Sequence, residues 1–214
     1  RSIGQFRPAL EWFLAGARVF GRSDLSGVTL LVDDSRGIRG NIGLPGCVPT
    51  PVQPLRVVIV STPVGPLGSG VGGGVELTLH SLVYGLSGLG HSVEVVAPAG
   101  SLHVGAMVHQ IEGVLQPSSQ LADRAAPVDV PTGSVLTAMW QRIADRQDDI
   151  DVVINLGYDW LPLYLTSFLA VPVVHFISMG SLNDAMDAAI HDLARRFPDR
   201  LGAHSRAQAD TFDR

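Results

Sequence analysis

The chain has 214 residues, of which 46 % are hydrophobic and 16 % are charged, and this composition can fill the core of one good-sized domain. Its formal net charge of −5 provides no electrostatic basis for binding nucleic acid. All 15 basic residues are arginine, so a phosphate-binding loop that depends on a lysine is excluded. The single cysteine, Cys47, excludes a disulfide framework and a cysteine-based metal site.

The first 54 residues differ in character from the rest of the chain. Residues 1–36 contain one predicted helix, Ala9–Phe20, and one possible short strand, Gly27–Val32, and we interpret them as an N-terminal extension of unclear fold. Charged residues interrupt the apolar run of that helix, so it does not resemble a secretory signal, and we expect a cytoplasmic location. Residues 37–54 are rich in glycine and proline, which is typical of a linker. The sequence therefore predicts a domain over residues 55–214.

Within this domain, predicted strands alternate with predicted helices. The six strands are predicted at Leu55–Ser61, Ser92–Ala97, Ala106–Glu112, Asp151–Asn155, Pro172–Phe176 and Arg200–His204. Helices are predicted at Val75–Leu89, Ser134–Arg146 and Trp160–Leu169, and a fourth follows a capping signature of Ser181 with Asp184. This alternation predicts a doubly wound, mostly parallel, Rossmann-like α/β sheet. Ligands of such sheets bind at the loops that follow the strands.

Leu161–Leu182 is the only stretch with the length and composition of a membrane span, because none of its 22 residues is charged. Pro162 and Pro172 divide it, however, so a short helix followed by a buried strand explains it better than a transmembrane segment. The histidines show no pair at metal-ligand spacing, and we expect no metal site.

A glycine-rich loop, Gly68–Glu76, lies between the first strand and its helix. Loops of this kind present backbone N–H groups and a positive helix end to an anion. Gly68, Gly70 and Gly73 match the dinucleotide pattern G-x-G-x-x-G, but they begin six residues beyond the strand, and the second strand ends without an acidic residue for a ribose. A flexible loop without a ligand is a further alternative.

Asp159 follows the fourth strand and precedes a helix. One interpretation is an N-cap, and the other is a carboxylate that binds a hydroxyl or amine of a ligand. Tyr158 and Trp160 on either side would offer stacking surfaces for such a ligand.

His175 lies inside the fifth strand, where a core histidine is the commoner explanation and a catalytic role is the alternative. Ser178 and Met179 lie just beyond the end of that strand, so they are better placed to contact a ligand.

Several of these stretches together resemble a known family. Four stretches are similar to the N-terminal domain of retaining glycosyltransferases of the glycogen-synthase-like group, family 4. They are Leu55–Ser61, the loop ending in Gly72–Glu76, the predicted helix Val75–Leu89 with its row of leucines, and Leu89–Val96. These enzymes have the GT-B fold, which consists of two Rossmann-type domains. The resemblance covers residues 55–214.

Three further stretches narrow the resemblance to one group of enzymes within this family. Ser61–Gly70, Tyr158–Pro162 and Ser178–Leu182 resemble the cyanobacterial enzymes that transfer glucose from UDP-glucose to tetrahydrobiopterin. Many relatives carry histidine at the position of Tyr158, and often another near Ser178, so this chain departs from the pattern there.

The resemblance implies a division of roles among these residues. It implies contact with the donor diphosphate for Gly72, Gly73, Gly74 and Glu76. It implies an acceptor-binding surface formed by Tyr158, Asp159, Trp160, Ser178 and Met179. The catalytic residue stays unassigned, with Asp159 and His175 as candidates. The partners it implies are a nucleotide sugar and a small acceptor, without a separate cofactor, and a C-terminal Rossmann domain that holds most of the donor and is absent from these residues.

Two alternatives from other classes stay open. The first is a non-catalytic Rossmann-type binding module or partner subunit. The second is an NAD(P)-dependent oxidoreductase, which the literal glycine pattern would fit.

Overall fold

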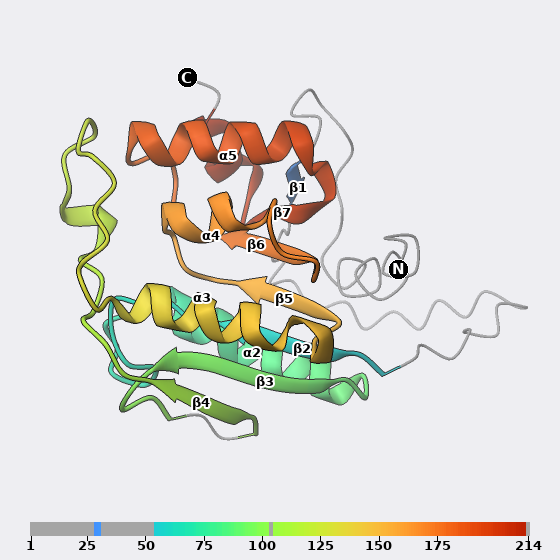
Figure 1. Cartoon of the computed structure of the whole chain (residues 1–214). Coiled ribbons are helices and arrows are strands. Elements are labelled where there is room, and N and C mark those ends of the chain that lie inside the picture. The colour runs from blue at the N-terminus through green and yellow to red at the C-terminus, as the bar shows by residue number, and fades with distance from the viewer. Residues whose placement is uncertain (1–27, 31–53, 103–104, 213–214) are drawn as a thin grey trace, which may run out of the picture.

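A computed structural model describes residues 28–30, 54–102 and 105–212, which form a parallel β-sheet with helices on both faces (Figure 1). The strands are β1 (Val28–Leu30), β2 (Arg56–Val60), β3 (Ser92–Pro98), β4 (Met107–Ile111), β5 (Val152–Asn155), β6 (Val173–Ile177) and β7 (Leu201–Ala203). Their order across the sheet is β1-β7-β6-β5-β2-β3-β4. The predicted doubly wound α/β architecture is confirmed.

The N-terminal predictions are only partly covered by this description. The helix predicted at Ala9–Phe20, and all of the predicted linker except Pro54, lie outside the described residues. The possible strand at Gly27–Val32 corresponds to β1, which pairs with β7 at the edge of the sheet. Part of the region interpreted as an extension therefore belongs to the sheet.

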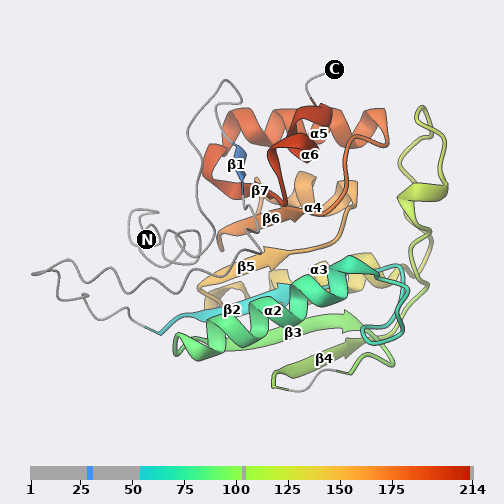
Figure 2. The same ribbon diagram turned by 180° about the vertical axis from the view of Figure 1, so that it is seen from behind.

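Five α-helices and four short 3₁₀ helices are described. The α-helices are α2 (Gly74–Gly88), α3 (Val135–Arg146), α4 (Trp160–Leu165), α5 (Asp184–Arg196) and α6 (Arg206–Ala209). The 3₁₀ helices are η2 (Ser119–Leu121), η3 (Gln147–Asp149), η4 (Pro198–Arg200) and η5 (Asp210–Phe212). Helix α3 lies in front of the sheet in Figure 1, and α2 lies in front in Figure 2, which shows the opposite face.

The continuous apolar run of β2 is explained by burial on both faces. Val57 and Ile59 pack in the core cluster under α2, whereas Val58 and Val60 pack in the cluster under α3. Successive side chains of a strand point to opposite faces, so a strand covered on both sides needs apolar residues throughout.

Two helix ends differ from the predictions by more than one residue. The N-cap of α5 is Asn183, whose side chain accepts hydrogen bonds from the amides of Ala185 and Met186, and the predicted cap Ser181 instead donates to Asp187 Oδ2 at 2.6 Å. Helix α4 ends at Leu165 instead of Leu169. Residues 166–168 form a turn instead, in which the amide of Phe168 donates to the carbonyl oxygen of Leu165.

The order of strands reverses between β2 and β5. From β2 the chain first adds β3 and β4 on one side, and then returns to place β5, β6 and β7 on the other. Val60, Asn155 and His175 are in register on three neighbouring strands, so the loops that follow them start at the same edge. This is the switch point at which parallel α/β sheets bind ligands.

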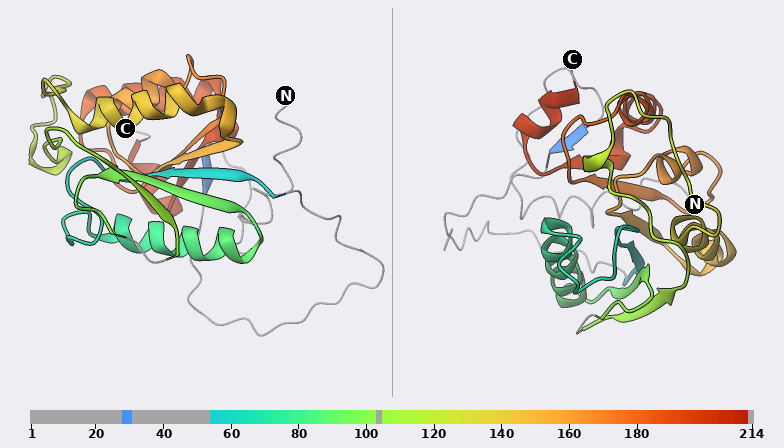
Figure 3. Two further views of the ribbon diagram at one scale, coloured as in Figure 1. Left: turned by 60° about the horizontal axis from the view of Figure 1, so that its bottom comes forward. Right: turned by 90° about the vertical axis from the view of Figure 1, so that its left-hand side faces the viewer.

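A long segment, residues 113–133, crosses this carboxyl edge of the sheet. It leaves β4 and runs along the edge towards the start of α5 before the chain returns to α3 (Figure 3). A parallel bridge between Val114 and Ser134 joins its two ends. The segment therefore forms one wall over the switch point.

The apolar stretch Leu161–Leu182 is divided between helix α4 and strand β6, as the two prolines predict. Over the described ranges, every helix is too short or too polar to cross a bilayer.

Candidate functional site

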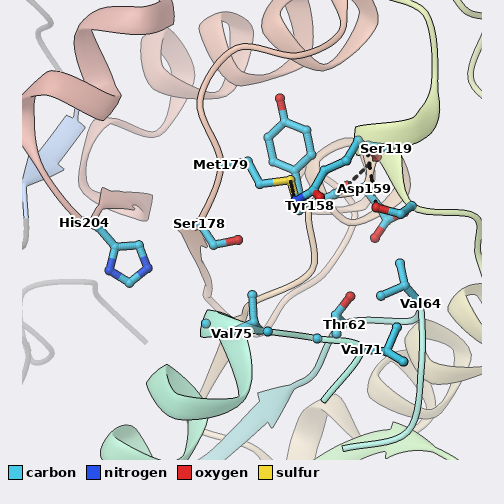
Figure 4. Close-up of a pocket in the computed structure, with 15 residues that line it drawn as sticks. Thr62, Val64, Val71, Val75, Ser119, Tyr158, Asp159, Ser178, Met179 and His204 are labelled. Atoms are coloured by element: carbon cyan, nitrogen blue, oxygen red, sulfur yellow. Dashed lines mark hydrogen bonds between the residues drawn. The ribbon is translucent and has the colours of Figure 1, made fainter. Parts of the chain in front are cut away.

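A cavity of about 300 Å³ lies at the carboxyl ends of the parallel strands (Figure 4). Its walls come from the loops after β2, β5 and β6, from the first residue after β7, and from the segment 113–133. The lining residues are Thr62, Val64, Val71, Gly72, Gly73, Gly74, Val75, Ser118, Ser119, Gln120, Tyr158, Asp159, Ser178, Met179 and His204. The cavity therefore lies where the sheet topology predicts a ligand.

Asp159 is the most unusual residue of this lining. It is only 7 % exposed, and its carboxylate has no hydrogen bond or ion pair with the described residues. It occupies the N-cap position of α4 without accepting a capping hydrogen bond, so the structure does not give it the role of a helix cap. Burial raises the pKa of Asp159 to about 7. Near neutral pH this group can therefore accept a hydrogen bond or a proton, or donate one.

Tyr158 connects two of the loops around the cavity. Its hydroxyl donates to the carbonyl oxygen of Gly180 at 3.3 Å, and its own carbonyl oxygen accepts from Ser119 Oγ at 3.3 Å. Burial raises the pKa of Tyr158 to about 12, so the phenol stays protonated. These contacts hold the loop after β5, the loop after β6 and the segment 113–133 against one another.

Ser178 presents a second polar group without a partner. Its Oγ is buried and has no hydrogen bond, and in Figure 4 the hydroxyl points into the cavity. Gln208 fixes this loop, because its side-chain amide donates to the carbonyl oxygens of Ile177 and Met179, each at 2.8 Å. Buried hydroxyls normally have a partner, so a free one in a cavity indicates a place for a ligand atom.

His175 lies outside the cavity lining. It is fully buried, with Nδ1 3.1 Å from Asn155 Nδ2 and Nε2 2.7 Å from Thr166 Oγ1. The amide NH₂ of Asn155 can only donate, so Nδ1 is the acceptor and Nε2 carries the proton. Burial lowers the pKa of His175 to about 3, which keeps the ring neutral. The structure thus gives this histidine the core position that was one of the two interpretations.

The same network shapes the loop that carries Asp159. Asn155 Nδ2 also donates to the carbonyl oxygen of Gly157, and Asn155 Oδ1 accepts from the Gly157 amide. A Cβ on Gly157 would lie 3.3 Å from Asp159 Oδ2 and 3.4 Å from Pro63 Cδ. The absence of a side chain at Gly157 therefore lets the Asp159 carboxylate fold back against the loop.

The carboxylate of Glu76 already accepts hydrogen bonds from amides of the glycine-rich loop. Its Oε1 accepts from the amides of Gly70 and Gly72 at 3.0 and 3.1 Å, and its Oε2 accepts from the Gly68 amide at 3.0 Å. The amide of Gly73 donates to the carbonyl oxygen of Gly70. The sequence predicts that these amides bind an anion. In the structure, three of them already donate hydrogen bonds to the carboxylate of Glu76. A diphosphate would have to compete with that carboxylate or bind at the start of α2.

We predict that Glu76→Gln loosens this loop. A glutamine side chain has one acceptor oxygen instead of two, so the amide of Gly68 or those of Gly70 and Gly72 lose their partner. A hydrogen bond to a charged group contributes about 1.5–3 kcal/mol, so exchange of the affected amides should accelerate about tenfold or more. Hydrogen exchange followed by NMR measures this change. Unchanged protection at all three glycines would show that the carboxylate does not hold the loop.

The lining of this cavity contains no arginine among its 15 residues. Its ionisable side chains are Tyr158, Asp159 and His204, and Figure 4 shows Asp159 and His204 on opposite sides. The first turn of α2 is therefore the main positive feature of the wall, through its helix dipole.

The structure brings together most of the residues singled out from the sequence. Gly72, Gly73, Gly74, Tyr158, Asp159, Ser178 and Met179 line the first cavity. Trp160 lines a neighbouring cavity and stacks on Tyr164, with 4.7 Å between the ring centroids. His175 and Glu76 are absent from both linings.

Sequence reasoning missed the residues of the segment 113–133. Ser118, Ser119 and Gln120 line the cavity, and the amide of Gln120 contacts Met179 Sδ at 3.8 Å. The signal was its length, because long irregular segments in compact domains commonly belong to functional sites. His204 was also missed, since the predicted sixth strand included it.

Comparison with models of known protein families finds no match for this chain, and comparison with curated proteins finds none either.

Proposed function

We propose that this chain is the N-terminal, acceptor-binding domain of a retaining glycosyltransferase with the GT-B fold. The reaction proposed for the complete enzyme is transfer of glucose from UDP-glucose to a small acceptor such as tetrahydrobiopterin. One observation carries the proposal. The three separate stretches that resemble these enzymes, namely the loop after β2, Tyr158–Asp159 and Ser178–Met179, line one cavity at the switch point of the sheet.

In the proposed mechanism this domain positions the acceptor. Asp159 accepts a hydrogen bond from an O–H or N–H of the acceptor, and Ser178 Oγ supplies a second polar contact. The bond between the glucose C1 and the donor phosphate oxygen breaks, and a bond from C1 to the acceptor oxygen forms on the same face. The acceptor proton passes to the leaving UDP. Positioning and stabilisation of the diphosphate then supply most of the rate enhancement.

The 15 described residues that line the first cavity include no arginine that could hold a diphosphate, so we assign the donor mainly to a second domain. Among the described residues, the donor would meet the start of α2, where the amides of Gly73 and Val75 already donate to the carbonyl oxygens of Gly70 and Gly72. We therefore expect the 214-residue chain to bind the acceptor without transferring glucose.

The test uses radiolabelled UDP-glucose and tetrahydrobiopterin with the protein expressed from its complete reading frame. We expect a labelled glucosyl-pterin, and we expect Asp159→Asn and Ser178→Ala to lower kcat/KM for the acceptor while leaving the KM for UDP-glucose little changed. Asp145→Asn, on the exposed face of α3, serves as the matched control. Absence of glucose transfer to any pterin would contradict the proposed acceptor. Variants that raise only the KM for UDP-glucose would contradict the assignment of this cavity.

A non-catalytic binding module is the second candidate, and the occupied glycine loop favours it. Glu76 satisfies amides that a donor phosphate would otherwise use. This candidate predicts acceptor binding by the complete protein with no hydrolysis or transfer of any nucleotide sugar. The same transfer assay therefore separates the two functions.

A further inference from the structure

A second cavity of about 180 Å³ lies beneath the segment 113–133, next to the first one. It shares Ser118, Ser119 and Asp159 with the lining of the first cavity. The rest of its wall comes from the same segment and from the starts of α3, α4 and α5. The buried carboxylate of Asp159 therefore lies at the boundary between the two cavities.

The two cavities differ in chemistry. Most of the second lining is apolar, including Leu121, Pro127, Val128, Leu136, Trp160 and Met186. Its charged residues are Asp129 and Asp159, both acidic, and no arginine or histidine is among its 16 residues. An apolar cavity of about 150 Å³ can hold a benzene ring. The second cavity is therefore large enough for one ring, and its acidic lining residues disfavour a negatively charged ligand.

The wall formed by the segment 113–133 is anchored at several points. Arg124 forms ion pairs with Asp184 at 2.8 Å and Asp187 at 2.6 Å, at the start of α5. Asn183 Nδ2 donates to the carbonyl oxygen of Ala126 at 3.1 Å. Gln116 Nε2 donates to the carbonyl oxygen of Asp129. These contacts hold the apolar wall in place without a ligand, as in most preformed binding sites.

We propose that the second cavity is a subsite for a single ring that carries an ammonium or N–H donor facing Asp159. The ring lies against the apolar wall, its donor gives the Asp159 carboxylate the hydrogen bond it lacks, and the remainder of the molecule extends into the first cavity. Carboxylates and phosphates are excluded, because the charged residues among the 16 that line this cavity are the acidic Asp129 and Asp159. This subsite deepens the proposed function, on which it rests, by assigning the non-reacting end of the acceptor.

The experiment measures binding of three matched probes to the 214-residue chain at pH 8 by isothermal titration calorimetry. The probes are 2-phenylethylamine, 2-phenylethanol and 3-phenylpropionate, which share a ring and differ in charge. We expect the amine to bind most tightly, and the carboxylate to bind at least about tenfold more weakly. Equal affinities for the amine and the carboxylate would overturn the proposal.

Three variants locate the ring. Val128→Phe fills the second cavity from its exposed wall and should abolish binding of the amine, and Ala122→Phe on the same wall is a second filling variant. Asp145→Asn, on the exposed face of α3 and outside both linings, is the control and should leave binding of the amine unchanged. Circular dichroism confirms the fold of each variant. Binding that survives both filling variants places the ring elsewhere and overturns the proposal.

The result of the ring-binding titrations can be distinguished from the result of the glucose-transfer assay. Ring binding in the second cavity together with absent glucose transfer would retain the subsite and reject the glycosyltransferase. Glucose transfer together with no binding of the amine would retain the enzyme and reject the subsite.

Discussion

Replacing Asp159 by asparagine is expected to stabilise the protein at pH 8, by at most about 4 kcal/mol. The carboxylate is buried without a partner, and this raises its pKa from the ordinary 3.8 to about 7. Each pKa unit corresponds to about 1.4 kcal/mol of cost for the charged form in the folded state. Asparagine removes that charge while it keeps the size of the side chain. Urea denaturation of both proteins at pH 8 measures the difference.

The size of this stabilisation depends on pH. The folded pKa of Asp159 lies above its unfolded value, so the folded state binds more protons between about pH 4 and pH 7. The contribution of this group to stability is therefore complete below pH 4 and is lost as the pH rises to 7. The advantage of the variant should be near zero at pH 4 and largest at pH 8.

The contribution of His175 to stability changes with pH in the direction opposite to that of Asp159. Its folded pKa of about 3 lies below its ordinary value of 6.5, so protonation of the unfolded state destabilises the fold as the pH falls below 6.5. The two slopes partly cancel in the wild-type protein between pH 4 and 6.5. Of these two slopes only that of His175 remains in Asp159→Asn, so the stability of the variant should rise more steeply with pH than that of the wild-type protein in that interval. An advantage of the variant that is equal at all pH values would indicate improved capping of α4 instead of removal of a buried charge.

A group that is kept ionisable at such a cost is more typical of a binding or catalytic site than of a structural one. The expected result would therefore combine higher stability with weaker ligand binding. That combination supports the role proposed for Asp159.

Gly113→Ala is expected to cost about 3 kcal/mol or more of stability, whereas Gly133→Ala should cost about 1 kcal/mol. Gly113 has φ +154°, and a Cβ there would lie 2.6 Å from the backbone N of Val135 and 2.9 Å from the carbonyl oxygen of Gly133. Gly133 has φ +69°, but a Cβ there meets nothing within 4 Å. Both alanines carry backbone strain of about 1–3 kcal/mol, and only the first adds a clash with backbone atoms.

Gly113 and Gly133 are the first and last residues of the segment 113–133, which forms a wall of both cavities. The two variants therefore also test the role of this segment in binding. Gly113→Ala should displace the segment and weaken binding of 2-phenylethylamine, and Gly133→Ala is the matched control. Urea denaturation and calorimetric titration of both variants provide the measurements. Equal losses of stability in the two variants would show that the contact with Val135 can relax without cost.

The sequence by itself determined the architecture and the edge at which a ligand would bind. The unbroken β-branched run of β2 required cover on both faces, and alternation with helices required parallel strands. Gly90, which directly follows the predicted helix Val75–Leu89, ends α2 in a left-handed conformation at φ +88°, where its amide donates to the carbonyl oxygen of Ser87. These features depend on neighbours within a few residues or on the period of a single element, which a sequence displays directly.

The state of each site residue was decided only by the tertiary structure. Asp159 could be located from the end of β5, but the lack of a partner for its carboxylate depends on loops distant in the chain. Capture of the loop amides by Glu76 depends on the path of the backbone between Gly68 and α2. One wall of the second cavity is anchored by Arg124, which contacts Asp187 of α5, 63 residues further along the chain. Such contacts join positions with no common periodicity, so the sequence alone predicts the position of the site but not its chemistry.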